Sequence, residues 1–400
     1  MPGDVPELPI DAEALATAVK LTGLDASYLQ PFDTADPFND NLPLRGFLSQ
    51  RPDHRYGGLA ITHVGEVPAA QFIPATPKLR YPFGRDGSFH FPRVKRVHLY
   101  EKLDGTNVLA YRYADGHGKL RLTYKLRLSP VLRNSRFGPF LDMWREILAR
   151  HPNISKLAEA NACSISFEMY GKRNAHLILY ENDLDAAVLF GVDAKFAIVA
   201  PCRLDLMGVP AAPLACELSA DADPVAKYAN VRAEMEQRNH ATDDEKLIGT
   251  EGMVWYFEDP TGLITMWKCK PESVEEIHWA AGINKKAVIA TCWNFLETAD
   301  NLTYESLQPL LLEEYTQEDI EKFSTNIRQS IEAVKLEFEF REHVLAKYDA
   351  LAAKGMSIHT DKGAVMRELS KQFERSEMKK VFSAISMRRK PPEGQRTIGK

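Results

Sequence analysis

The 400-residue sequence has few cysteines and no long apolar segment. No CxxC pair or zinc-like spacing occurs, and the odd number of cysteines indicates free thiols in a reducing compartment. No apolar run approaches the roughly 20 residues that a membrane span needs. Residues 1–6 lack the basic and apolar regions of a signal peptide. We therefore expect a cytoplasmic protein with no membrane partner. The cysteines are Cys163, Cys202, Cys216, Cys269 and Cys292.

The sequence also lacks the motifs of several large enzyme classes. It has no GxGxxG after a predicted strand, no GxxxxGK[ST] phosphate loop, and no GxSxG or HExxH. The histidines show no metal spacing. The net charge of −5 excludes a globally basic nucleic-acid binder. A nucleic-acid partner would therefore need a local basic groove.

Short apolar runs separated by turns dominate residues 71–272 and favour an α+β protein. They predict strands at 97–99, 106–113, 120–128, 164–169, 187–192, 252–257 and 263–269. One helix is predicted at 138–150. The sequence at 115–118 predicts a hairpin turn between two of the strands. We expect antiparallel sheets flanked by helices in this domain.

The chain on either side of this domain has a different pattern. Residues 1–70 predict a short helix at 11–21 among loops rich in Pro, Asp and Asn, and their role is unassigned. Helical periodicity after 271 predicts helices at 271–297, from 316 to a stop at Gly355, and at 363–386. The predicted domains are an N-terminal extension (1–70), a sheet domain (71–272), an all-helical C-terminal domain (273–390) and a disordered tail (391–400).

The most informative segment is EKLDGTN at 101–107. A lysine at a strand edge beside a tight turn is a candidate covalent nucleophile, because a neutral amine can attack phosphorus or a carbonyl. Taken alone, KxDG favours a solvated lysine in a surface turn. Lys102 therefore needs support from the rest of the sequence.

Four later segments supply that support. Glu168 ends an apolar run in FEMYG, and Phe190 lies in VLFGVD, which is typical of a buried strand. Glu251 opens EGMVW. Lys268 and Lys270 in MWKCK share one face of a strand, because strand side chains alternate. Each segment also has an ordinary structural interpretation: strand-edge carboxylates, a core phenylalanine, and an exposed edge strand guarded by lysines.

Together these residue types match nucleotidyl transfer. Deprotonating an ordinary lysine at neutral pH costs about 4–5 kcal/mol, and neighbouring cations or a divalent metal lower that cost. Lys268 and Lys270 supply such charge and can neutralise an α-phosphate. Carboxylates can hold Mg²⁺. A buried aromatic ring can stack on a base.

The ordered set EKLDGTN, FEMYG, VLFGVD, EGMVW and MWKCK resembles motifs I, III, IIIa, IV and V of the covalent nucleotidyltransferases, over roughly residues 75–272. Asn107 stands where DNA ligases and capping enzymes typically have arginine, and is similar to the RNA-ligase-2-like branch. The resemblance implies a nucleotidyltransferase (adenylation) domain of an ATP-dependent RNA ligase. It would join RNA 3′-hydroxyl and 5′-phosphate ends through lysyl-AMP and RNA-adenylate, with Mg²⁺ or Mn²⁺. We expect a monomer.

The resemblance also implies a role for each matching residue. Lys102 forms lysyl-AMP, Glu101 reads the adenine amino group, Gly105 belongs to the nucleotide-binding turn, Asp104 and Asn107 take part in sealing, Glu168 contacts ribose or metal, Phe190 stacks on adenine, Glu251 binds metal, and Lys268 and Lys270 contact the α-phosphate and the transferring groups.

Some alternatives remain open. A short basic motif after the first hairpin matches both Lys125 and Arg127, which share a predicted strand face, so either can contact the nucleotide or the 5′-phosphate. Arg133 and Arg136 can touch RNA phosphates or lie solvated in a loop. The alternative functions are a DNA ligase, a capping-type nucleotidyltransferase, and a non-catalytic module that binds nucleotide or RNA ends.

Overall fold

The computed structural model describes residues 11–387, except 52, 78, 84–87, 93, 136–137, 175, 220–222, 242–246, 272–273, 275–284, 300, 313–314, 316 and 359. The chain divides into two compact units, Met1–Phe323 and Ser324–Lys400. The predicted domain boundaries at 70, 272 and 390 remain predictions. The predicted tail at 391–400 lies outside the described residues. None of the helices within the described ranges is long and apolar enough to cross a membrane.

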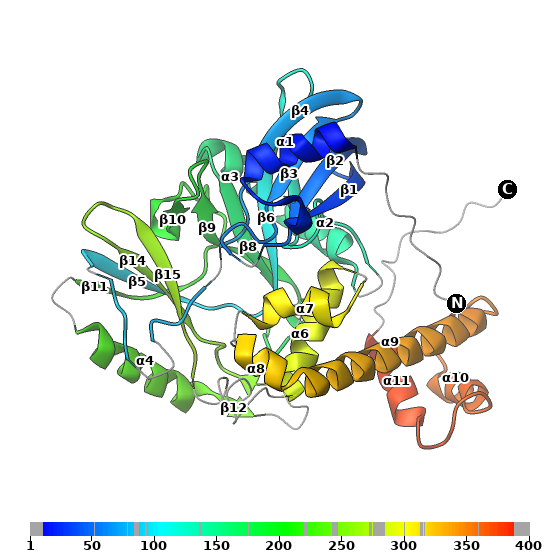
Figure 1. The fold of residues 1–400 in the computed structure, drawn as a ribbon. Helices are drawn as coiled ribbons and strands as arrows, with labels where there is room; N and C mark the ends of the chain where they lie inside the picture. Colours follow the sequence, from blue (N-terminus) through cyan, green and yellow to red (C-terminus); the bar gives the residue numbers. More distant parts are fainter. Residues whose placement is uncertain are drawn as a thin grey trace. The chain divides into compact units, whose positions relative to one another are not determined.

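The first unit begins with a helix packed on a four-stranded antiparallel sheet (Figure 1). The Asp11 carboxylate caps the helix, which ends at Gly23 with a φ of 64°. Ala14 and Ala18 pack against Phe47. The predicted helix is confirmed. The prediction of loops after it is wrong, because most of those residues form the strands of this sheet. The elements are α1 (Ala12–Thr22), η1 (Ala26–Tyr28), β1 (Leu29–Asp36), β2 (Leu42–Ser49), β3 (Leu59–Val64) and β4 (Val67–Ile73).

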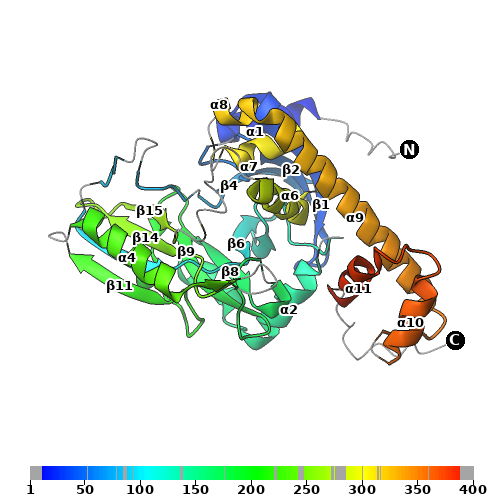
Figure 2. The same ribbon diagram turned by 90° about the horizontal axis from the view of Figure 1, so that it is seen from below.

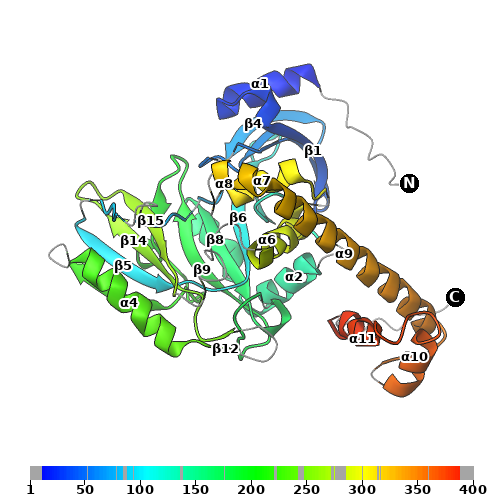
Figure 3. The same cartoon turned by 60° about the horizontal axis from the view of Figure 1, so that its bottom comes forward.

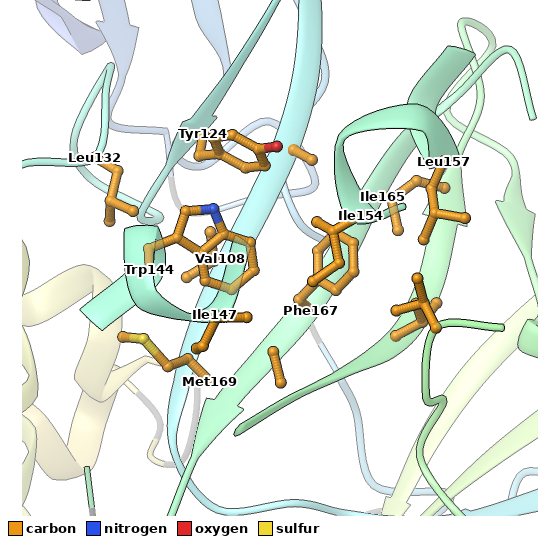
Figure 4. Close-up of a cluster of buried hydrophobic side chains, with 14 of the residues drawn as sticks. Val108, Tyr124, Leu132, Trp144, Ile147, Ile154, Leu157, Ile165, Phe167 and Met169 are labelled. Carbon is orange, nitrogen blue, oxygen red and sulfur yellow. The ribbon is translucent and has the colours of Figure 1, made fainter. Parts of the chain in front are cut away.

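A five-stranded antiparallel sheet follows, in the order β10-β9-β8-β6-β7. One face packs on α2 (Phe140–Arg150) and α3 (Ile154–Ala160). Trp144 of α2 is fully buried and meets Phe167 edge-on at a ring distance of 5.4 Å (Figure 4). The strands are β6 (Thr106–Ala114), β7 (Leu120–Lys125), β8 (Ser164–Tyr170), β9 (Asp185–Val192) and β10 (Ile198–Val199).

A second four-stranded sheet has the order β11-β5-β14-β15. Helix α4 (Pro224–Arg238) covers one face, where Tyr228 and Val231 pack against Leu99 and Trp255 (Figure 2). The other face packs against β9 of the five-stranded sheet through a cluster that includes Tyr256. The strands are β5 (Arg96–Glu101), β11 (Leu214–Ser219), β14 (Met253–Glu258) and β15 (Ile264–Cys269).

Helices dominate the rest of the chain. In the second unit α10 and α11 pack on α9 around Val344 and Val365 (Figure 3). The helix predicted from 316 to Gly355 is instead two helices with a break at Phe323. The helix predicted at 363–386 is also two. Residues 272–273 and 275–284, where another helix was predicted to begin, lie outside the described residues. The helices are α6 (Lys285–Thr298), α7 (Tyr304–Leu311), α8 (Gln317–Lys322), α9 (Ser324–Ala352), α10 (Lys362–Leu369) and α11 (Met378–Met387).

The predicted α+β class is confirmed, because every paired strand in the described ranges is antiparallel and helices flank the sheets. All seven strands predicted in 71–272 occur as β5, β6, β7, β8, β9, β14 and β15. The predicted hairpin turn also occurs, with Gly118 at a φ of 78° between β6 and β7. Helices α3, α4 and α7 were not predicted.

A buried carboxylate joins the N-terminal sheet to the five-stranded sheet. Asp36 accepts hydrogen bonds from the hydroxyls of Tyr113 on β6 and Thr123 on β7, both at 2.8 Å. It also accepts from the main-chain N–H of Phe38 and the side-chain amide of Asn39. Four donors satisfy this carboxylate, which is 0% exposed.

We predict that Asp36→Ala lowers the thermal unfolding midpoint of the protein. The substitution leaves the Tyr113 and Thr123 hydroxyls buried without their acceptor, and each such group costs about 1–3 kcal/mol. Asp33→Ala is the control, because Asp33 is exposed on the same strand. Equal midpoints for the two variants in a thermal melt would show that the hydrogen bonds of Asp36 contribute nothing to the stability of the protein.

Candidate functional site

Lys102 lies between the sheet that contains β5 and the five-stranded sheet, directly after β5 and shortly before β6. Its main-chain N–H donates to the carbonyl of Gly252 at 2.8 Å. Gly252 has a φ of 154°, and a Cβ there would lie 2.4 Å from the Cys269 carbonyl oxygen. Only glycine therefore allows this approach. The consequence is that the ends of β5, β14 and β15 converge around Lys102.

Glu251 lies between two lysines at these strand ends. Its Oε2 accepts a short hydrogen bond from Lys102 Nζ, and its Oε1 lies 3.1 Å from Lys270 Nζ. Burial works to raise the pKa of Glu251, but the charges of the two lysines outweigh it and lower the pKa to about 2. Glu251 is therefore a carboxylate at every physiological pH.

The same contact sets the protonation state of Lys102. Burial works to lower the pKa of Lys102, but the charges of Glu251 and Glu168 outweigh it and raise the pKa. Lys102 is thus held as an ammonium in this arrangement. An attacking amine must be neutral, so the contact with Glu251 has to change before Lys102 can act as a nucleophile.

Glu168 and Asn107 face each other across β8 and β6. Residues directly opposite in a strand pair lie on one face of the sheet. The Asn107 side-chain amide donates to Ser166 Oγ at 2.8 Å and to the Phe167 carbonyl at 3.1 Å. Burial, and then the charge of Glu251, raises the pKa of Glu168 to about 8. Glu168 is therefore mostly protonated at neutral pH.

Lys268 is buried with Lys270, each 6% exposed. Lys268 Nζ lies 4.3 Å from the centroid of the Tyr81 ring, a cation–π distance. The main-chain N–H of Lys268 donates to the Arg80 carbonyl at 2.8 Å. The exposed edge strand guarded by lysines is therefore excluded, because both lysines point into the protein.

Phe190 and Glu101 lie at the edges of this site. Phe190 is opposite Ser166 and only 4% exposed, in the cluster between the two sheets. Glu101 Oε1 lies 3.2 Å from Arg238 Nη2 in the last turn of α4. Arg238 was not predicted from the sequence.

Gly105 and Asp104 form the turn after Lys102. A Cβ on Gly105 would lie 2.2 Å from the Met169 carbonyl oxygen, so glycine is required for β6 to pass this close to β8. Asp104 is 8% exposed, and its carboxylate turns away from solvent toward the main-chain N–H groups of Leu177 and Ile178.

Lys125 and Arg127 do not share a strand face, which corrects the prediction. β7 ends at Lys125 rather than at residue 128, because the chain turns around the Lys125 ammonium. Lys125 Nζ donates to the carbonyls of Gly57, Leu126 and Arg127 at 2.8–3.0 Å. Burial, and then the charge of Arg127, lowers the pKa of Lys125 to about 7. The guanidinium of Arg127 lies 5.8 Å from the ring centroid of Tyr56.

The site thus gathers most of the predicted residues. Arg133 is exposed after β7, and Arg136 lies outside the described residues. No group of three or more His, Cys, Asp or Glu side chains suited to a metal ion occurs in the part of the chain that is described. Sequence patterns contain no signal for Arg238, Tyr81 or the segment near Asp104, because these parts come from distant regions of the chain.

Comparison with known proteins gives structural matches only. No family model and no curated protein matches the chain. An archaeal ATP-dependent RNA ligase aligns with 84% of this chain and 82% of its own, at 15% identity and a TM-score of 0.47. A Naegleria gruberi RNA ligase variant with ATP and Mn aligns with 52% of this chain and 57% of its own, at 16% identity and a TM-score of 0.34.

A further match is described as a candidate ATP-dependent DNA ligase from Aquifex aeolicus. It aligns with 91% of this chain and 89% of its own, at 11% identity and a TM-score of 0.39. The matches name the class of enzyme that the sequence motifs resemble. At TM-scores below 0.5 they carry no argument about the site or the substrate.

We predict that Glu168→Gln becomes more stable relative to the native protein as the pH rises. Burial raises the pKa of Glu168 from 4.5 to about 8, so the folded state binds the extra proton between these values. The stability from the neutral carboxyl is complete below pH 4.5 and is lost as the pH rises toward 8. Glutamine stays neutral, so we expect its melting temperature to gain a few degrees on the native protein between pH 5 and pH 8.5. Glu159→Gln, at an exposed position on α3, should show no such trend.

Proposed function

We propose that the protein is an ATP-dependent RNA ligase. The observation that carries the proposal is the position of Lys102, whose amine is bonded to Glu251 while Lys270 holds the same carboxylate. Glu168 and Asn107 lie opposite each other on the neighbouring sheet. A lysine, buried cations and carboxylates at one place are what adenylyl transfer requires.

In the first step the neutral amine of Lys102 attacks the α-phosphorus of ATP. The N–P bond forms as the bond from this phosphorus to its bridging oxygen breaks, and pyrophosphate leaves. Lys268 and Lys270 are buried cations that can neutralise the α-phosphate without reorganising. ATP binding also has to draw Glu251 away from Lys102, so that the amine can lose its proton.

Two further steps complete sealing. An oxygen of the RNA 5′-phosphate attacks the phosphorus of lysyl-AMP, which frees the amine of Lys102 and gives RNA-adenylate. The 3′-hydroxyl of the other RNA end then attacks the 5′-phosphate, forms the phosphodiester and releases AMP. Asn107 is held by Ser166 and accepts a hydrogen bond from Thr76 Oγ1 at 3.2 Å, so its amide is oriented for these steps.

The carboxylates fit a divalent cation, Mg²⁺ or Mn²⁺. Burial, and then the charge of Glu251, raises the pKa of Glu168 to about 8, because the charge of Lys102, which lowers this pKa, is too small to offset them. Mg²⁺ is usually held by one or two carboxylates together with substrate phosphates and waters. Glu168 and Glu251 suit that mode rather than an all-protein cage. When bound, the ion would neutralise phosphate charge.

Adenine would be read at the edge of the site. Glu101 can accept a hydrogen bond from the adenine amino group through the oxygen that Arg238 does not hold. Phe190 would stack on the base from the cluster between the sheets. Arg127 suits contact with a 5′-phosphate better than Lys125, whose ammonium already donates to three carbonyls.

We predict that α-labelled ATP gives a covalent protein adduct and that Lys102→Ala lowers its yield by at least about a thousandfold, because no other amine occupies this position. Lys95→Ala is the matched control, since Lys95 is an exposed lysine paired with Glu258. The measurement is labelled protein on a denaturing gel. If the Lys102→Ala variant still forms the adduct, the assignment of Lys102 as the nucleophile is wrong. Labelling by GTP in place of ATP would favour a capping-type enzyme.

We predict that the protein seals 5′-phosphorylated RNA with ATP and Mg²⁺, and that Asn107→Ala slows phosphodiester formation from preformed RNA-adenylate by roughly tenfold or more. Self-adenylation of this variant should change much less. The assay compares nicked, looped and single-stranded RNA with DNA strands of the same sequence. Equal sealing of all-DNA nicks would contradict the RNA assignment and favour a DNA ligase.

A further inference from the structure

The connection between β8 and β9 folds back toward Lys102. It begins at Gly171, continues through the short helix η2 (Lys172–Asn174) and ends before Asp185. Residues 176–180 of this connection run past the turn that follows Lys102. We refer to residues 176–180 as the wall segment.

Asp104 bonds the wall segment through both its side chain and its main chain. Its Oδ2 accepts the main-chain N–H groups of Leu177 at 2.5 Å and Ile178 at 2.7 Å. Its own N–H donates to the Tyr180 hydroxyl at 2.7 Å. Three hydrogen bonds therefore connect one residue of the Lys102 turn to three residues of the wall segment.

Further contacts hold the wall segment from both sides. Before it, the Asn174 side chain donates to the Met169 carbonyl at 2.6 Å and accepts from Thr106 Oγ1 at 3.3 Å. On its outer side, Leu247 donates to the Leu177 carbonyl and accepts from the N–H of Leu179, both at 2.9 Å. The wall segment is thus a layer between the Lys102 turn and β13 (Leu247–Ile248).

The position of Asp104 is electrostatically unfavourable. Burial, and then the charge of Glu251, raises the pKa of this carboxyl. Two N–H donors on one oxygen compensate for part of that cost, because hydrogen bonds to a charged acceptor are the strong ones. Because both donors belong to the main chain of the wall segment, the same hydrogen bonds hold that segment in place. Holding the wall segment therefore explains why a carboxylate is present at this buried position.

We propose that Asp104 is a positioning residue, which fixes the wall segment beside Lys102 and takes no proton from the reactants. This inference rests on the proposed function. It assigns Tyr180 to the same task, since the Tyr180 ring packs against the cluster between the sheets and meets Tyr170 edge-on at 5.0 Å. The wall segment then bounds the space in which ATP meets Lys102.

Comparing Asp104→Asn with Asp104→Ala tests this role. The single oxygen of asparagine can accept both N–H groups, whereas alanine accepts neither. We expect asparagine to keep self-adenylation within about threefold of the native rate and alanine to lose about thirtyfold or more, mainly as a higher KM for ATP. If the negative charge itself served the chemistry, asparagine would be as poor as alanine, and the proposal would be overturned.

Amide hydrogen exchange supplies a readout that needs no activity. Without nucleotide, the N–H groups of Leu177 and Ile178 should be protected in the native protein and in Asp104→Asn, and should exchange faster in Asp104→Ala. Unchanged protection in the alanine variant would contradict the proposal. If the native protein forms no adduct with ATP, the proposed function fails instead, and the exchange result stands on its own.

Two variants complete the design. Asp259→Ala removes a carboxylate of the same kind, which accepts the N–H groups of Thr261 at 2.8 Å and Leu263 at 3.0 Å in the turn between β14 and β15. It should leave self-adenylation unchanged, and an equal loss would contradict a specific role for Asp104. Tyr180→Phe serves if Asp104→Ala does not fold. Loss of its one hydrogen bond should raise the KM for ATP about three- to fivefold with kcat unchanged, and an unaltered KM would count against the proposal.

Discussion

The contact of Glu251 with Lys102 and Lys270 is the interaction on which the rest of the site depends. The three residues lie at the ends of β14, β5 and β15, which are neighbours in one sheet. Glu101 pairs with Met253, and Met253 pairs with Cys269. A shift of one residue in either pair would turn the side chains to the other face. The strand register therefore places the ion pairs, and Gly252 lets the strand ends come close enough to form them.

These ion pairs also hold Lys102 as an ammonium, which is not a nucleophile. Burying a charge is costly unless it is paired, and here lysines and carboxylates compensate for each other. Glu251 pairs with both Lys102 and Lys270, and Lys268 lies over the Tyr81 ring. Such a cluster keeps Lys102 protonated and Glu168 mostly neutral. A phosphate chain arriving with a cation would change both, because it adds charge of each sign at the same place.

The sequence was sufficient for the elements with strong local patterns. Short apolar runs predicted the strands that contain Glu168 and Lys268 and the strands that flank Lys102 and Glu251. Five short motifs predicted that these residues meet. It was misleading where proline occurs inside strands. Pro31 and Pro68 lie in β1 and β4, which are the edge strands of the N-terminal sheet and therefore tolerate proline.

Long-range contacts were beyond the reach of sequence patterns. Asp104 is bonded to residues more than 70 positions away, and Arg238 reaches Glu101 from a helix that was not predicted. Lys125 was one of two alternatives predicted to contact the nucleotide or the 5′-phosphate, and its register opposite Leu109 places it on the face of Asn107. Its ammonium is bonded to carbonyls instead, because a turn and the Gly57 loop close around it. No local sequence pattern predicts such a turn.

Strand β6 connects the N-terminal sheet to the site. β6 begins beside Asn107 and ends at the hairpin next to Tyr113, whose hydroxyl is bonded to Asp36 of the N-terminal sheet. Just after β4, Thr76 donates to Asn107. The N-terminal sheet therefore fixes both ends of β6. The orientation of the Asn107 amide then depends on residues that the sequence motifs leave out, since strand and sheet are held as one body by buried hydrogen bonds.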